Sequence, residues 1–224
     1  MQKPTGAQRL ASIVLTVAVP IVLFFTPLYL FVTDGFVRHE YNTRGFPTSV
    51  RFERAERERL SSVIIGYLRG RASEEDMASM LTDSGEVAMR PKEVEHIADV
   101  KGVMDGMYVA HGIALACALA AIILRTDRPL MALALRRGIW IVVGVIGLIL
   151  LSSFVDFDAF FTRFHQVFFQ ANTWLFYETD MLIQLYPLPF WVAAVWKMGV
   201  VILLEVLVVW VVSAMMARRM KEAT

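Results

Sequence analysis

Several features are scarce or missing in this 224-residue sequence, and each absence excludes a class of protein. There is one cysteine, Cys117, so no disulfide can form within the chain, and no Cys/His spacing typical of a metal site occurs. The net charge is +1, which gives no electrostatic reason for nucleic-acid binding. We therefore expect no metal, no other cofactor and no nucleic-acid partner.

Charged residues are also scarce, at 19%, whereas 57% of the residues are hydrophobic. This balance is too apolar for a soluble domain and is typical of an integral membrane protein. About 20 apolar residues cross a bilayer. The sequence therefore predicts an all-α polytopic fold, a single membrane domain over residues 1–224, with transmembrane helices at about 10–32, 104–124, 138–155 and 191–216.

The first of these runs contains no charge between Leu10 and Val32. A cleaved signal peptide is the alternative, but its apolar region is usually shorter and ends at small residues. Because this run ends at Tyr29-Leu30-Phe31-Val32, we favour an uncleaved anchor. Pro20 and Pro27 lie inside it, and each is expected to bend the helix.

The long polar segment 34–103 is expected to form a helical cap. Apolar residues recur along Arg51–Arg69 with the spacing of one helix face: Leu60, Val63, Ile64, Tyr67 and Leu68. Opposite charges four residues apart predict two solvent-side ion pairs: Glu53 with Arg57 and Arg54 with Glu58. Such a helix lies in the membrane interface, roofs a cavity between spans or belongs to a small soluble cap, and these alternatives stay open.

Local signals divide the rest of this segment. Ser73 with Asp76 resembles a capping box that opens a short helix, and residues 83–85 read as a turn. Pro91 suits the first turn of a helix that continues into the second span. His96 and Asp99 are three residues apart on that helix, so the carboxylate can fix the tautomer of the imidazole. The alternative is a surface pair of no consequence.

The stretch 164–190 is apolar and aromatic, yet it carries His165, Glu178 and Asp180. Polar groups at membrane depth are costly and usually face a protein interior or a wet cavity. We therefore interpret 156–190 as an outer active-site segment, either re-entrant or lying flat on the membrane. The alternative is an aromatic loop that only anchors the chain at the interface.

Short basic loops predict the orientation. The N-terminal tail, the connector 125–137 and the C-terminal tail are rich in Arg and Lys and fall on one side of a four-span protein. By the positive-inside rule that side is the cytoplasm, and segments 34–103 and 156–190 share the outer face. The pairs His96/Asp99 and His165/Asp180 can then converge there, a set suited to general acid–base chemistry. Ser152 and Ser153 remain possible nucleophiles, although neither lies in a nucleophile-elbow motif.

Three sequence motifs carry a family resemblance: HIADVKGV at 96–103, FHQVFFQANTW at 164–174 and TDMLIQLYPLPFW at 179–191. In this order they resemble a family of bacterial four-span integral membrane proteins that includes the lipoprotein intramolecular transacylase, Lit. The sequence departs from the family pattern around Phe176 and Tyr177, which bears on substrate preference. His39 and His111 match no motif, and Glu205, inside the fourth span, is expected to bond to a neighbouring helix.

The resemblance implies an O-to-N acyl transfer within one diacylated lipoprotein in the bacterial cytoplasmic membrane. It moves the sn-2 acyl chain of the S-diacylglyceryl cysteine to that cysteine's α-amino group. We assign His165 as general base and acid, and His96, oriented by Asp99, as the second acid–base group or oxyanion donor.

Supporting and substrate-binding roles complete the assignment: Lys101, Asp180, Phe168, Phe169 and Trp174. Lys101 can instead bind a headgroup or peptide, and the aromatic residues can simply pack. Two alternatives to a transacylase stay open. One is a different lipid-acting enzyme on the same scaffold, an acyl hydrolase, and the other is a non-enzymatic accessory or lipid-binding protein. The oligomeric state stays open.

Overall fold

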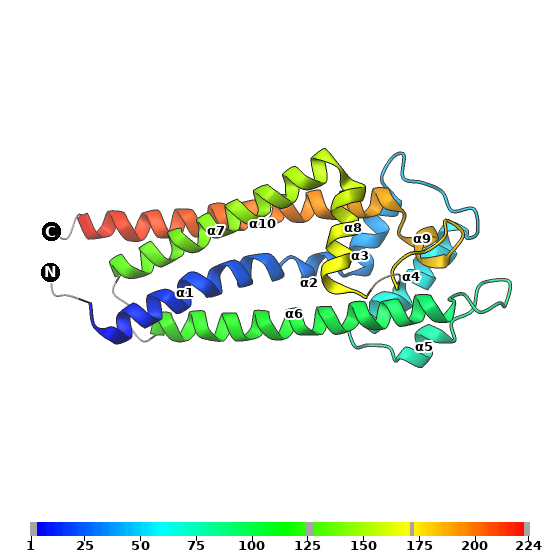
Figure 1. The fold of residues 1–224 in the computed structure, drawn as a ribbon, viewed down its shortest axis with the longest axis horizontal. Coiled ribbons are helices and arrows are strands. Elements are labelled where there is room, and N and C mark those ends of the chain that lie inside the picture. The colour runs from blue at the N-terminus through cyan, green and yellow to red at the C-terminus, as the bar shows by residue number, and fades with distance from the viewer. Residues whose placement is uncertain (1–3, 124–127, 171–172, 222–224) are drawn as a thin grey trace. The chain divides into compact units, whose positions relative to one another are not determined.

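The computed structural model describes residues 4–123, 128–170 and 173–221 (Figure 1). Those ranges contain ten helices, α1 to α10, and one isolated antiparallel bridge between Leu81 and Val87. The beginning of the expected basic connector, including Arg125, lies outside them. The chain divides into two compact units. The bundle unit comprises Met1–Pro27, Met107–Leu151 and Met198–Thr224, and the polar unit comprises Leu28–Gly106 and Ser152–Lys197.

Within the described ranges, four helical stretches are long and apolar enough to cross a membrane: Gly6–Phe31, Pro91–Ile123, Pro129–Val155 and Leu188–Ala217. They correspond to α1 (Gly6–Phe25) with the short α2 (Leu28–Phe31), to α6 (Pro91–Ile123), to α7 (Arg128–Val155) and to α10 (Leu188–Lys221). A long apolar helix therefore lies at each of the four predicted spans.

Proline explains two helix boundaries, whereas Pro20 lies inside α1 without interrupting it. The first span is interrupted between Phe25 and Leu28, because Pro27 has no N–H to continue the backbone ladder. Pro91 is the first residue of α6, where a missing N–H costs nothing. As a result α6 is one continuous helix of 33 residues, and it begins well before the apolar run that predicted the span.

In the bundle unit, the long helices pack through the fit of apolar side chains and small residues. Its buried core draws aliphatic residues from all four long helices, including Leu15, Val142 and Ile202. A Cβ added to Gly138 would lie 2.7 Å from the Cβ of Val19, so α7 and α1 approach closely at this glycine. Small residues at such crossings are typical of membrane helix packing.

The polar unit contains the shorter helices: α3 (Asp34–Tyr41), α4 (Arg54–Leu68), α5 (Glu74–Ala78), α8 (Phe157–Phe168) and α9 (Met181–Leu185). Capping residues fix where several of them begin. Ser73 and Asp76 form the expected capping box at α5, and Asp156 accepts a hydrogen bond from Ala159 N at the start of α8. The expected turn at 83–85 is present, with Gly85 at φ +85°.

The expected amphipathic helix is α4, and its apolar face is turned inward, with Leu60 and Ile64 almost fully buried. Arg54 pairs with Glu58 at 3.2 Å as predicted. The predicted pairing of Arg57 with Glu53 is wrong. Arg57 is buried and donates to the carbonyl of Pro47 at 3.0 Å, and its guanidinium lies 4.4 Å from the ring centroid of Tyr41. Stacking on the Tyr41 ring and a hydrogen bond to the partly buried Pro47 carbonyl replace the surface ion pair.

Candidate functional site

Two histidines from distant parts of the sequence meet within the polar unit. His96 lies near the start of α6 and His165 in the last turn of α8, and both are buried. Their ring centroids are 6.1 Å apart, with an angle of 25° between the ring planes. Two imidazoles at this separation can act on the same small group of reacting atoms.

The backbone fixes the tautomer of His165. Its Nδ1 lies 2.8 Å from the carbonyl oxygen of Phe161, one turn earlier in α8. A carbonyl oxygen only accepts, so Nδ1 carries the hydrogen and Nε2 keeps the lone pair. Burial lowers the pKa of His165 below its ordinary value, and the hydrogen bond to Phe161 opposes that shift without reversing it. His165 is therefore a neutral imidazole with Nε2 as its basic atom at neutral pH.

Aromatic rings surround the two imidazoles. Phe169 lies 5.0 Å from His96 and 5.6 Å from His165, measured between ring centroids. Phe161 and Trp174 lie 4.1 Å and 4.8 Å from His165. Phe176 lies 5.3 Å from His96. An apolar enclosure of this kind suits an acyl chain and keeps water away from reacting groups.

Two nitrogen atoms in this cluster are buried and have no hydrogen-bond partner among the described residues. They are Nδ1 of His96 and the indole Nε1 of Trp174. Buried polar atoms are nearly always paired in folded proteins, so unpaired ones at one place mark a position where a ligand atom can bind.

Glu93 and Asp180 hold the segment before α9 against the start of α6. The carboxylate of Glu93, almost fully buried, accepts from Leu182 N at 2.8 Å and from Arg90 N at 2.9 Å. Asp180 forms an ion pair with Arg90 at 2.7 Å and accepts from Tyr177 N at 2.8 Å. These bonds connect residues 177–182 to the helix that carries His96.

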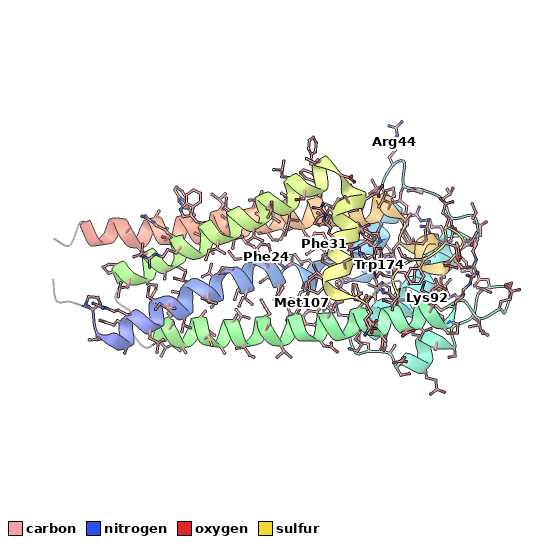
Figure 2. The ribbon with its side chains drawn as sticks, viewed as in Figure 1. Phe24, Phe31, Arg44, Lys92, Met107 and Trp174 are labelled. Atoms are coloured by element: carbon pink, nitrogen blue, oxygen red, sulfur yellow. The ribbon has the colours of Figure 1, made fainter. Side chains whose placement is uncertain are left out.

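Lys92 fixes the preceding part of the same loop. Its ammonium donates to the carbonyl of Leu175 at 2.7 Å and lies 5.4 Å from the ring centroid of Phe176. Lys92, on α6, and Trp174, on the loop after α8, are both labelled in Figure 2. The loop is thus bonded to α6 on either side of the residue that contacts His96.

No group of three or more His, Cys, Asp or Glu side chains that could hold a metal ion occurs in the part of the chain that the structure describes. The cluster instead offers a base, a second imidazole, a neutral indole N–H and an apolar lining. Such a set supports proton transfer and stabilisation of a developing oxyanion.

Comparison with known proteins decides the family. The family model described as lipoprotein intramolecular transacylase Lit matches residues 11–191, most of the chain. The chain belongs to the Lit family. A curated relative of the Lit-family chain, an uncharacterized protein from Aquifex aeolicus (strain VF5), is 23% identical over 190 residues, covering 82% of this chain and 84% of the relative.

Solved structures of the membrane integral Lit from Bacillus cereus share the fold. One has a TM-score of 0.82 at 16% identity, covering 96% of this chain and 98% of the other. A form with a histidine-to-arginine substitution gives a TM-score of 0.74 at 18% identity, with coverages of 97% and 95%. The resemblance and the all-α fold predicted from sequence are thereby confirmed, and this Lit-family chain is an integral membrane protein.

The structure brings together four of the residues assigned from the sequence: His96, His165, Phe169 and Trp174. Phe168 is adjacent but 40% exposed, with its ring 4.9 Å from that of Phe164. The carboxylate of Asp180 already bonds to Arg90 and to Tyr177 N, so it holds the loop in place and does not face the two histidines as a free group. Lys101 pairs with Asp105 at 2.9 Å, and its ammonium lies 5.7 Å from the ring centroid of Tyr67.

Asp99 is not brought to His96 in this Lit-family structure. It is exposed, makes no hydrogen bond or ion pair within the described residues, and lines a separate hollow of about 500 Å³ with Glu74 and Glu95. His96 Nδ1, the atom that Asp99 was expected to bind, has no partner there. The structure therefore gives no support to Asp99 as the group that orients His96.

The sequence did not single out Glu93, Arg90 or Lys92, or Phe176 as a contact of His96. A usable signal for Glu93 existed, because it also lies three residues from His96. The buried residues Ile97 and Met104 lie on the Glu93 side of the helix, at roughly 100° per residue, whereas Asp99 turns away. The apolar periodicity therefore identifies which acid faces the interior.

Proposed function

We propose that this protein moves the sn-2 acyl chain of an S-diacylglyceryl-cysteine lipoprotein to the α-amino group of the same cysteine, giving the lyso-form. The observation that carries the proposal is the stacked pair His96 and His165 inside an aromatic enclosure, 6.1 Å apart, in a chain of the Lit family. The partners of this chain would be a diacylated lipoprotein and the membrane lipid around it.

The proposed reaction needs only a proton shuttle. The neutral α-amine attacks the ester carbonyl carbon, and the C=O electron pair moves onto oxygen. Nε2 of His165, the atom that the Phe161 carbonyl leaves with a lone pair, takes a proton from the ammonium so formed. The C–O bond to glycerol then breaks, and the glycerol oxygen receives that proton. His96 is the second acid–base group, and no electron or water enters the balance.

Two further features support acyl transfer over hydrolysis. The acceptor amine and the ester belong to one molecule, so no cost of bringing two lipids together is added. The rings of Phe161, Phe169, Phe176 and Trp174 crowd the two imidazoles, which disfavours water as a competing nucleophile. Phe168 and Phe169 are proposed to contact the acyl chain.

Mass spectrometry of lipoprotein N-termini tests the proposal. The protein is produced with a diacylated lipoprotein in cells that make no lyso-form of their own, as wild type, His165→Ala, His96→Ala and His39→Ala. We expect N-acylated lyso product from the wild type and from His39→Ala, whose exposed side chain lies outside the cluster. Loss of a general base costs about 10²–10⁴-fold in rate, so both other variants should give almost none.

The other outcomes are distinct. Free fatty acid in place of N-acyl product would identify a hydrolase. Unchanged lipoprotein in every strain would identify an accessory or lipid-binding protein. Wild-type product from His96→Ala or His165→Ala would remove that residue from the mechanism.

We also propose that both termini lie in the cytoplasm and that the site faces outward from the bacterial cytoplasmic membrane. Cysteine labelling tests this orientation after the native thiol is removed by Cys117→Ser, because Cys117 is exposed. In intact cells, whose membrane stays sealed, His96→Cys and His165→Cys should both react with a small membrane-impermeant thiol reagent added from outside. Labelling of the two positions from opposite compartments would exclude a shared catalytic centre.

A further inference from the structure

The two indoles near the histidine pair are treated differently by the fold. Trp191 donates its Nε1–H to the carbonyl of Tyr186 at 3.0 Å. Trp174, whose ring lies 4.8 Å from that of His165, has a buried Nε1 with no acceptor in the described ranges. Leaving a buried donor unpaired costs about 1–3 kcal/mol, so a fold that keeps one beside its base needs a reason.

We infer that Nε1–H of Trp174 is the hydrogen-bond donor to the carbonyl oxygen of the ester under attack, and that it stabilises the oxyanion of the tetrahedral intermediate. The inference rests on the proposed acyl transfer and gives Trp174 a catalytic role rather than a packing role. An indole N–H donates and cannot accept or lose a proton at ordinary pH, so it contributes electrostatic stabilisation without competing with His165 for the proton.

Two buried nitrogen atoms of the cluster have no partner in the described ranges, Nδ1 of His96 and Nε1 of Trp174, and His96 is already assigned as the second acid–base group. The ammonium of Lys92, the cation bonded to the same loop, donates a hydrogen bond to the Leu175 carbonyl at 2.7 Å. Arg90 is held by Asp180 at 2.7 Å. His165 Nδ1 is held by Phe161 O. A donor and a base must both reach the atoms of one ester group, and the Trp174 and His165 rings, 4.8 Å apart between centroids, lie close enough for one ester to contact both.

The bonds formed and broken in this reaction balance. As the amine nitrogen bonds to the carbonyl carbon, the π pair moves to the oxygen, and Nε1–H of Trp174 donates to it. When the intermediate collapses, the C=O bond re-forms, the C–O bond to glycerol breaks and the glycerol oxygen takes the proton from His165. The Trp174 hydrogen stays on nitrogen throughout.

An isosteric replacement separates the N–H from the ring. Trp174→β-(3-benzothienyl)alanine keeps the bicyclic shape and replaces N–H by sulfur. Purified full-length protein in lipid is assayed with a diacylated lipopeptide. Removing one oxyanion donor costs about 10²–10³-fold in kcat, and we expect that loss with KM changed by less than about threefold. Trp174→Phe should lose kcat at least as much. The same replacement at Trp196, which is 39% exposed and packs on Phe154, is the matched control and should leave kcat unchanged.

Each other result overturns the inference. Wild-type kcat in the benzothienyl variant would show that the N–H is not used. A raised KM with unchanged kcat would show that Trp174 only binds the acyl chain. If the benzothienyl variant shows no cooperative thermal unfolding transition and is therefore not folded, kcat and KM of Trp174→Phe are compared with the wild type instead. Absence of N-acyl product from the wild type would refute the proposed function itself, whereas activity that depends on His165 but not on Trp174 would refute this inference alone.

Discussion

The bundle unit and the polar unit are held together by different physics. In the bundle unit, aliphatic side chains fill the space between long helices, and two glycines, Gly138 and Gly199, stand where a Cβ would meet a neighbouring side chain within 3 Å. In the polar unit, buried carboxylates and cations bond to backbone groups, as Glu93 and Arg57 do. The first unit is therefore sensitive to volume and the second to the loss of single polar atoms.

The largest effect should come from removing a buried carboxylate in the polar unit. Glu93→Ala leaves Leu182 N and Arg90 N without their acceptor. We expect the free energy of unfolding to fall by about 2–5 kcal/mol, because each backbone donor loses a charge-assisted hydrogen bond. Thermal unfolding in detergent measures the change, and kcat should fall as well, because the loop loses a bond to the helix of His96.

Glu95→Ala is the matched control, since Glu95 is an exposed acid on the same helix. A surface change of this kind is expected to stay within about 0.5 kcal/mol. Equal stability of the two variants would show that Glu93 does not hold the polar unit together.

A smaller effect is expected from adding one methyl group in the bundle unit. Gly138→Ala places Cβ 2.7 Å from the Cβ of Val19 and 3.3 Å from the backbone oxygen of Thr16, so α1 and α7 must separate. Overpacking of this kind costs about 1–3 kcal/mol. Gly144→Ala, on the same helix but with no atom within 4 Å of the new Cβ, should be neutral or slightly stabilising. Equal unfolding temperatures for the two variants would contradict the claim that α1 and α7 need a glycine at position 138 to pack closely.

The smallest effect, confined to acidic pH, concerns His165. Its pKa is lowered by burial, so the imidazole stays neutral at pH 7 and becomes protonated only below its ordinary value near 6.5. The logarithm of kcat/KM should fall with a slope of about one below the pKa of the substrate amine, roughly 7.7–8.0. The slope should steepen to about two only below pH 6.5. A steepening of the slope above pH 7 would show that the pKa of His165 is not lowered.

The same protonation bears on stability. The folded-state pKa of His165 is lower than the unfolded value, so the unfolded chain binds the proton more readily. Stability is therefore unaffected above the unfolded value near 6.5 and is lost as the pH falls through the folded pKa.

The long helices could be predicted because charge is excluded from hydrocarbon, and that rule alone places four spans. Proline and capping chemistry likewise predicted the start of α6 at Pro91 and of α5 after Ser73. The site was harder. The three-residue spacing from His96 is the same for Glu93 and Asp99, so only the apolar positions Ile97 and Met104 could separate the two acids. The bonds of Asp180 to Arg90 and Tyr177 depend on the path of a loop, which no periodicity records.

The hydrogen bond from His165 to the carbonyl of Phe161 has a consequence for how charge moves. A carbonyl orients an imidazole but, unlike a carboxylate, carries no negative charge to stabilise the imidazolium. His165 is thus built to borrow a proton briefly and return it, which matches a rearrangement whose substrate and product carry the same number of protons when both are neutral. A base of this kind suits chemistry that begins and ends within one molecule.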